Sequence, residues 1–193
     1  MSATAELPQD VINEFVLSGH GNLARVKALL AQYPGVLNAR APWNETALGA
    51  AAHTGQVEIA EHLLAAGAPL DICTAAMLDR RAEILAMLDA EPALVHATGA
   101  HGFPLLFYPA IHGRVELAEL LVARGADVNA GGDGVNTALH AAAGFDQPAM
   151  VAWLLARGAR PDARGYQDKT PLAMAESLGH AEVVALLRRA GAV

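Results

Sequence analysis

The chain has 193 residues, of which 53% are hydrophobic and 17% charged, so it is long enough and apolar enough to bury a core. Its 20 acidic residues outnumber 13 basic ones, and the formal net charge of -7 argues against a nucleic-acid partner, which needs clustered Lys and Arg. Aromatic residues make up only 5% of the chain, and its alanine-rich segments favour helices that approach one another closely.

The first segment, MSATAELPQD, has neither the basic stretch nor the apolar stretch of a secretory signal. No apolar run approaches the roughly 18 residues that a membrane-spanning helix needs. Cys73 is the only cysteine, which excludes an internal disulfide and fits a reducing compartment. We therefore expect a cytoplasmic monomer with a buried structural thiol and no membrane partner.

A pattern recurs along the chain with a constant period, since Gly125, Gly158 and Gly191 are spaced 33 apart (158 − 125 and 191 − 158). In each copy a Thr or Pro opens a short Ala-rich helix, a Gly or Asp ends it, and a second helix with paired apolar residues follows. Thr170 can cap a helix through its hydroxyl, and Pro171 suits the first helical position, where no amide hydrogen is needed. The pattern predicts helix-turn-helix repeats.

The segments TALH at 137, TPLA at 170 and RGADVNA from Arg124 resemble ankyrin repeats. The resemblance covers roughly residues 7–193. It implies an all-α ankyrin-repeat solenoid in which helix-turn-helix units stack side by side and hairpin fingers project from them. In this family the first helices and the fingers form a concave face that usually binds protein.

Six repeats are expected within one domain spanning residues 1–193. In chain order their approximate bounds are 8–39, 40–70, 71–97, 98–130, 131–163 and 164–193. The third repeat is short by about nine residues, because Leu63-Leu64 and Met87-Leu88 lie only 24 apart, and the part that it lacks is the finger. The proline-containing linkers QYPGVLNA and AEPALVHA are similar to those of short bacterial ankyrin proteins.

The fourth repeat departs from the family pattern, since it reads PLLFYPAIHG. Pro109 lies inside its expected first helix, where a proline removes a hydrogen bond and should bend the helix.

The resemblance implies a non-enzymatic protein-binding module, an adaptor, scaffold or regulator that holds another protein in its groove and at its finger tips. Exposed aromatic side chains are typical of such interfaces, and Trp43, Phe103, Phe145 and Tyr166 fall at groove or finger positions. An alternative for Trp43 and Phe103 is that they pack finger on finger. The expected partner-binding residues are Trp43, Glu45, His53, His101, Phe103, His112, Asn136, Phe145, Tyr166 and Lys169.

The missing finger predicts a notch between the fingers of the second and fourth repeats, with Met77 and Leu78 as its floor. A notch with aromatic walls and a few polar groups is typical of small-molecule sites. The alternative function is therefore a small-molecule binder or an atypical enzyme, and its acid–base candidates are His53, His101, Tyr108 and His112. The simpler interpretation is a deletion that the solenoid tolerates.

No metal and no cofactor are expected. His53 and His112 come from helices two repeats apart, about 20 Å at the usual helix spacing. That is far beyond the reach of one zinc ion, whose bonds measure about 2.1 Å. The segment from Gly19 to Ala24 matches the GxGxxA fingerprint of dinucleotide-binding proteins, but it lacks the preceding strand and the later acidic residue, so it is predicted to be an inter-helix turn.

Overall fold

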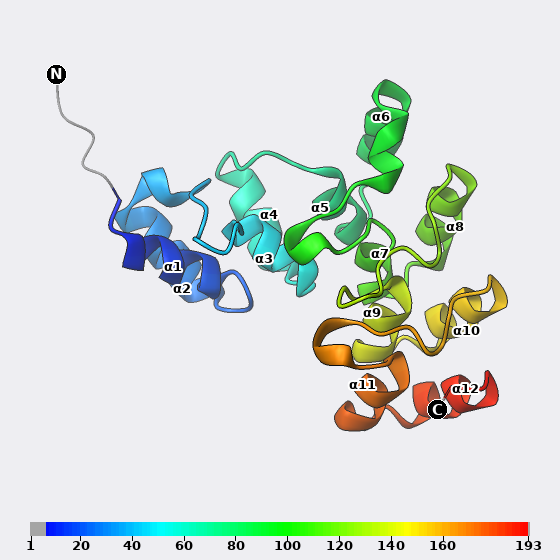
Figure 1. The fold of residues 1–193 in the computed structure, drawn as a ribbon. Coiled ribbons are helices and arrows are strands. Elements are labelled where there is room, and N and C mark those ends of the chain that lie inside the picture. The colour runs from blue at the N-terminus through cyan, green and yellow to red at the C-terminus, as the bar shows by residue number, and fades with distance from the viewer. Residues whose placement is uncertain (1–6, 193) are drawn as a thin grey trace, which may run out of the picture. The chain divides into compact units, whose positions relative to one another are not determined.

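The computed structural model describes residues 7–192, and its regular elements there are twelve α-helices and four short 3-10 helices (Figure 1). The first helices of the repeats are α1 (Gln9–Ser18), α3 (Ala47–His53), α5 (Ile72–Met77), α7 (Phe107–Ile111), α9 (Ala138–Gly144) and α11 (Pro171–Leu178). The second helices are α2 (Leu23–Gln32), α4 (Val57–Ala65), α6 (Arg81–Ala90), α8 (Val115–Ala123), α10 (Pro148–Ala156) and α12 (Ala181–Arg189). The 3-10 helices are η1 (Pro34–Val36), η2 (Pro92–His96), η3 (Ala100–Gly102) and η4 (Tyr166–Asp168). The all-α fold class is therefore confirmed.

The chain groups into two compact units, the first ending at Leu70 and the second beginning at Asp71. The N-terminal unit holds the first two repeats and the C-terminal unit holds the other four. The division coincides with the expected start of the short third repeat. The single domain stays a prediction, and so does the notch, which would draw residues from both units.

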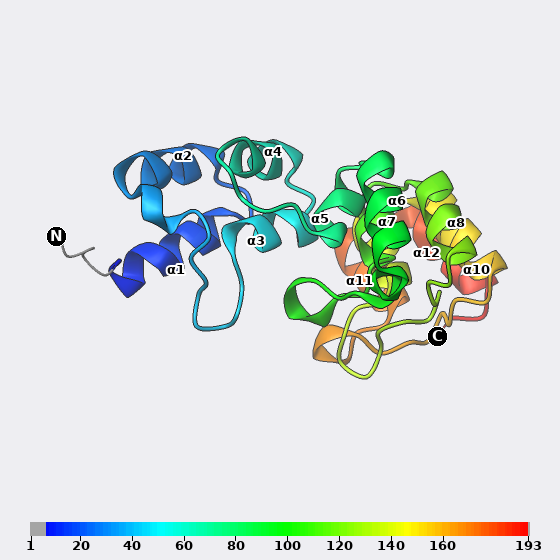
Figure 2. The ribbon, with the colours of Figure 1, turned by 90° about the horizontal axis from the view of Figure 1, so that it is seen from above.

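Within each unit the repeats stack through like helices. In the N-terminal unit α1 packs against α3 and α2 against α4 (Figure 2). In the C-terminal unit α5, α7, α9 and α11 form one row, and α8, α10 and α12 form a second row beside it (Figure 1). None of the described helices has the length and apolar character that crossing a bilayer requires.

The cap predicted at Thr170 is present, and two further threonines cap their helices in the same way. The hydroxyls of Thr46, Thr137 and Thr170 each accept a backbone N–H three residues later, at 3.0, 3.4 and 3.1 Å. His140 completes the second of these caps, because its Nδ1 accepts the N–H of Thr137 at 3.1 Å. Its Nε2–H then donates to the carbonyl of Lys169 at 3.0 Å. His140 is fully buried, and that burial lowers its pKa, so its role is structural.

Burial fixes the register of the second helices. The leucines at 88, 121, 154 and 187 recur at the period of 33 and are all buried. Leu63 is the buried leucine of α4, and its spacing to Leu88 is only 25 (88 − 63). The third repeat is therefore eight residues shorter than the period (33 − 25), slightly less than alignment of the leucine pairs suggests. The missing residues are those of the finger, since only six residues separate Ala65 from Ile72. By contrast, the segment before α3 projects as a long loop in Figure 2.

The expectation that Pro109 bends its helix is wrong, because the first helix of the fourth repeat starts later than the sequence predicts. Residues 105–106 form a turn that is closed by a hydrogen bond from the N–H of Phe107 to the carbonyl of Pro104 at 2.9 Å. The helix begins at Phe107, so Pro109 lies in its first turn. Amide hydrogens there have no partner within the helix, and a proline removes no hydrogen bond.

The turn between α1 and α2 confirms the interpretation of the glycine motif that begins at Gly19. α1 ends at Ser18 and α2 begins at Leu23, so a helix and not a strand precedes the motif.

Replacement of Leu121 by alanine should lower the free energy of unfolding by about 2–5 kcal/mol, because it empties a buried site between two repeats. Leu120→Ala, at the half-buried neighbour, is the control and should cost markedly less. Urea denaturation measures both losses. Equal losses would contradict the assignment of Leu121, and not Leu120, as the buried leucine of α8.

The lowered pKa of His140 predicts a pH dependence of stability. Below the ordinary histidine pKa of about 6.5 the unfolded chain takes up a proton that the folded chain resists. The free energy of unfolding should therefore fall as the pH drops below this value. His140→Gln should show a smaller fall, together with a loss of about 1–3 kcal/mol at pH 7 from its broken hydrogen bonds. Urea denaturation at several pH values, with the exposed His96→Gln as control, measures the effect.

Candidate functional site

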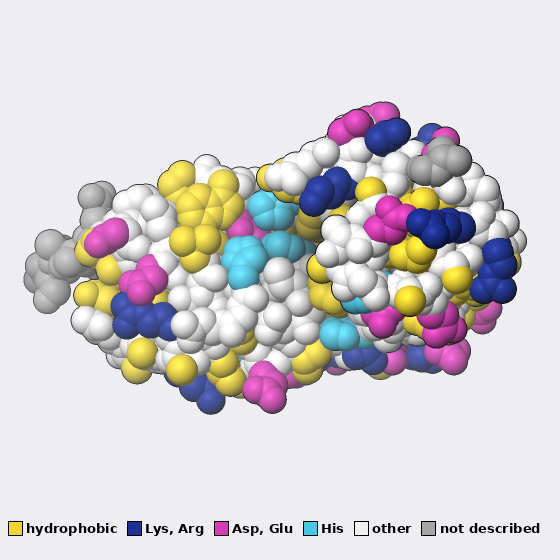
Figure 3. All heavy atoms as spheres, turned by 90° about the horizontal axis from the view of Figure 1, so that it is seen from below, with side chains coloured by type: hydrophobic (Ala, Val, Ile, Leu, Met, Phe, Trp, Pro, Cys, Tyr) yellow, Lys and Arg dark blue, Asp and Glu magenta, His cyan; other side chains and the backbone are white. Residues whose placement is uncertain are grey.

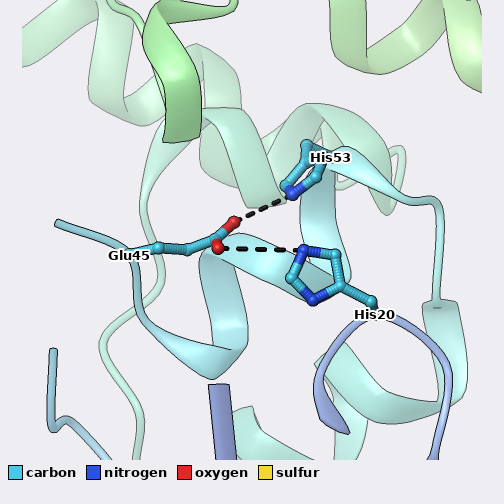
Figure 4. A group of neighbouring side chains, drawn as sticks. All are labelled: His20, Glu45 and His53. Atoms are coloured by element: carbon cyan, nitrogen blue, oxygen red, sulfur yellow. Dashed lines mark hydrogen bonds and ion pairs between the residues drawn. The ribbon is translucent and has the colours of Figure 1, made fainter. Parts of the chain in front are cut away.

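Three polar side chains meet inside the N-terminal unit: His20, Glu45 and His53 (Figure 4). One nitrogen or oxygen atom from each lies within 4.8 Å of the others. We call this group the His–Glu–His cluster. His20 comes from the turn between α1 and α2, Glu45 from the finger before α3, and His53 from the last position of α3.

The backbone places Glu45 at the base of its finger. The N–H of Ala41 donates to the carbonyl of Glu45 at 2.8 Å and closes the finger. Thr46 then caps α3, so the carboxylate is held beside the start of a helix that carries His53 at its other end.

A close approach at Gly19 brings His20 to the same place. A β-carbon on Gly19 would lie 2.6 Å from the carbonyl oxygen of Ala47. Because glycine has no β-carbon, the turn that carries His20 can lie directly against α3. The two imidazole rings consequently meet edge to face, with their centroids 5.1 Å apart.

Hydrogen bonds orient the cluster. The Nε2 of His53 lies 2.8 Å from Oε1 of Glu45, and the indole N–H of Trp43 donates to Oε2 at 2.8 Å. The Nε2 of His20 lies 3.7 Å from the same Oε2. The Nδ1 of His20 lies 3.2 Å from the carbonyl of Leu17, and a carbonyl can only accept, so Nδ1 carries the proton. When His20 is neutral, its Nε2 presents a lone pair towards Glu45, and when it is protonated, the same nitrogen carries a proton that faces the carboxylate.

Glu45 is a buried charged group, with an exposed side-chain fraction of 2%. Burial raises the pKa of its carboxyl, but the hydrogen bonds from His53 and Trp43 and the charges of the two histidines lower it further than burial raises it. The net effect is a lowered pKa, so Glu45 stays ionised in the protein interior. A buried anion between two imidazoles can hold a proton or a metal cation.

The residues expected to bind a partner divide by exposure. Trp43, Phe145 and Tyr166 have exposed fractions of 41%, 39% and 63%. Phe103 is buried, because its ring stacks on Phe107 with the centroids 4.3 Å apart, so the expectation that it projects as an exposed aromatic is wrong. Glu45 is likewise enclosed in the cluster and is not a finger-tip residue.

The polar members of that set also differ in their surroundings. His101 is exposed at a finger tip, Lys169 is exposed beside the last finger, and His112 is half-buried at the end of α7. Asn136 links two fingers, because its side-chain oxygen accepts the N–H of Tyr166 at 2.9 Å.

Tyr108 cannot serve as the accessible acid–base group of the alternative function. It is fully buried, and burial raises the pKa of its hydroxyl far above neutral pH. Cys73 is buried close by, and burial together with the charge of Asp71 raises the pKa of its thiol. The buried thiol is confirmed, and the burial of Tyr108 argues against the catalytic role considered for it.

A family model described as ankyrin repeats (3 copies) matches residues 15–132 and 106–192. The chain belongs to the ankyrin repeat family. The resemblance seen in the sequence is thereby confirmed. Ankyrin repeats generally mediate protein–protein interaction.

The His–Glu–His cluster is not predicted by the sequence patterns. They give Glu45 and His53 as separate partner contacts, and the distance argument against a metal concerns only His53 and His112. The signal that could have found the cluster is the repeat period itself, since His20 and His53 stand one period apart in adjacent repeats (53 − 20 = 33).

Glu45→Ala should lower the free energy of unfolding by about 1.5–3 kcal/mol, because it leaves the N–H groups of Trp43 and His53 without their charged acceptor. Glu58→Ala, at an exposed position of α4, is the matched control and should stay within about 0.5 kcal/mol of the wild type. Chemical denaturation compares the two, and similar losses would show that the cluster adds nothing to stability.

Proposed function

We propose that this ankyrin repeat protein is a non-enzymatic binding module that holds a partner protein through exposed aromatic side chains in its turns and fingers. The observation that carries the proposal is where these side chains lie. Among the described residues, the exposed large aromatics are Trp43, Phe145 and Tyr166. Trp43 lies in a finger, Phe145 in the turn after α9, and Tyr166 in the finger helix η4.

Aromatic side chains in such places suit binding, because they bury a large area with few rotatable bonds. Trp43 is further restrained, since its indole N–H is bonded to Glu45 while the ring remains partly exposed. A side chain that is already held in one orientation loses little entropy when a partner binds.

The finger tips provide a second line of support. His101 and Gln167 both have φ of 56°, in the left-handed region that side chains other than glycine rarely adopt. They occupy equivalent places in their fingers, two repeat periods apart. A backbone strained in this way persists only where its surroundings fix it, and such positions often serve function.

The partner would be a protein with a basic surface, because the net charge of -7 favours association with positive charge. In this proposal the protein acts as a monomeric adaptor, scaffold or regulator in a bacterial cytoplasm. It needs no cofactor for this role.

Affinity capture from a lysate of the source organism, read by mass spectrometry, identifies the partner. Phe145→Ala and Tyr166→Ala should each weaken its binding about tenfold or more, as loss of an exposed aromatic contact typically does. Val57→Ala is the matched control, since Val57 is an exposed hydrophobic residue on a second helix, away from the fingers. If the partner binds the Phe145→Ala, Tyr166→Ala double variant as tightly as the wild type, these aromatics are not its binding site.

A further inference from the structure

We propose that His20, Glu45 and His53 form a binding site for a divalent transition-metal ion. The inference goes beyond protein binding and does not depend on it. It concerns the N-terminal unit alone. In this proposal one ion is bound by three side chains that the fold brings together from three segments (Figure 4).

The distances suit one small ion. In a tetrahedral site with bonds of about 2.0–2.1 Å, neighbouring ligand atoms lie about 3.3 Å apart. The Nε2 of His20 lies 3.7 Å from Glu45 Oε2, and the Nε2 of His53 lies 2.8 Å from Glu45 Oε1. One separation is above the ideal value and the other below it, and one ligand atom from each residue lies within 4.8 Å of the others, so small side-chain rotations would bring all three onto one ion.

The proton on His20 is already where a metal ligand needs it. A metal-binding histidine usually donates its other ring N–H to a backbone carbonyl or a carboxylate, which fixes the tautomer. The Nδ1 of His20 lies 3.2 Å from the carbonyl of Leu17 and leaves the Nε2 lone pair facing the carboxylate. On the other side, His53 would bind the ion through Nε2 in the tautomer that carries its proton on Nδ1.

The carboxylate is prepared in the same manner. Only 2% of the Glu45 side chain is exposed, and a dication placed beside its carboxylate would offset the cost of burying a negative charge. The indole N–H of Trp43 holds Oε2 at 2.8 Å and thereby orients the carboxylate. Such an outer hydrogen bond typically changes metal affinity by about 10–100-fold.

The ligand types select the class of metal. Two imidazoles and one carboxylate suit zinc or iron(II), whereas calcium and magnesium prefer oxygen ligands alone. Three protein ligands leave a coordination position for water. The His20 side chain is 33% exposed, so solvent reaches the edge of the site. On the face drawn in Figure 3, histidine side chains reach the surface beside an acidic one.

The test uses the full chain freed of metal. Zn²⁺ is titrated by calorimetry, and Co²⁺ by its visible absorption, which reports a site of low coordination number. We expect one ion per chain. The variants His20→Asn and His53→Gln each keep a hydrogen-bond donor for the partner of the replaced ring but lose the imidazole. Each should weaken Zn²⁺ binding at least about 100-fold, and Trp43→Phe about tenfold.

His96→Ala is the matched control, because His96 is an exposed histidine in η2 of the C-terminal unit, and it should bind Zn²⁺ as the wild type does. Thermal melts without metal check that each variant folds. His20 is partly exposed in a turn, so at least its variant should retain the fold. A wild type that takes up no stoichiometric ion, or that binds Zn²⁺ no tighter than His20→Asn, would overturn the proposal.

Discussion

Each repeat of this protein can bury its apolar side chains only against the next repeat, and this constraint orders the rest of the structure. From α6 to α12 the buried leucines of the second helices recur at the repeat period, because each of these repeats presents the same side chain to its neighbours. The alanines of the first helices serve the same need, since small side chains let helices lie close together. In α3, Ala50 and Ala51 are fully buried, and the absence of a side chain at Gly19 lets the preceding turn meet that helix.

Positions outside these stacking surfaces are free to differ. One such position is the residue at the base of each finger, directly before the Thr or Pro that opens the repeat motif. In four repeats this residue is Glu45, Phe103, Asn136 and Lys169, respectively. The backbone there is similar, because the carbonyls of Glu45, Phe103 and Lys169 all accept a finger-closing N–H, at 2.8, 3.0 and 2.9 Å. The side chains nevertheless become a buried carboxylate, a stacked ring, a link between fingers and an exposed cation. One backbone position thus supports four kinds of chemistry.

The features that could be predicted from the sequence are those that repeat. The period predicts the helices, Thr170 predicts its cap, and the apolar context of Cys73 predicts its burial. Departures from the repeat were less predictable. The late start of α7 at Phe107 and the burial of Phe103 and Tyr108 depend on how one irregular segment packs. The His–Glu–His cluster depends on a close approach at Gly19, and residue spacing alone does not specify the distance between a turn and a helix.

Two hydrogen bonds described above join the last two repeats through their fingers. His140 caps α9 and also donates to the carbonyl of Lys169, and Asn136 accepts the N–H of Tyr166. The helix cap of the fifth repeat is therefore hydrogen-bonded to the finger of the sixth. Unfolding of either one alone would leave a polar group of the other without its hydrogen bond. In a linear array such shared bonds act as nearest-neighbour coupling. The C-terminal repeat should consequently not fray by itself, and local opening at this end of the chain should involve both repeats in a single cooperative step.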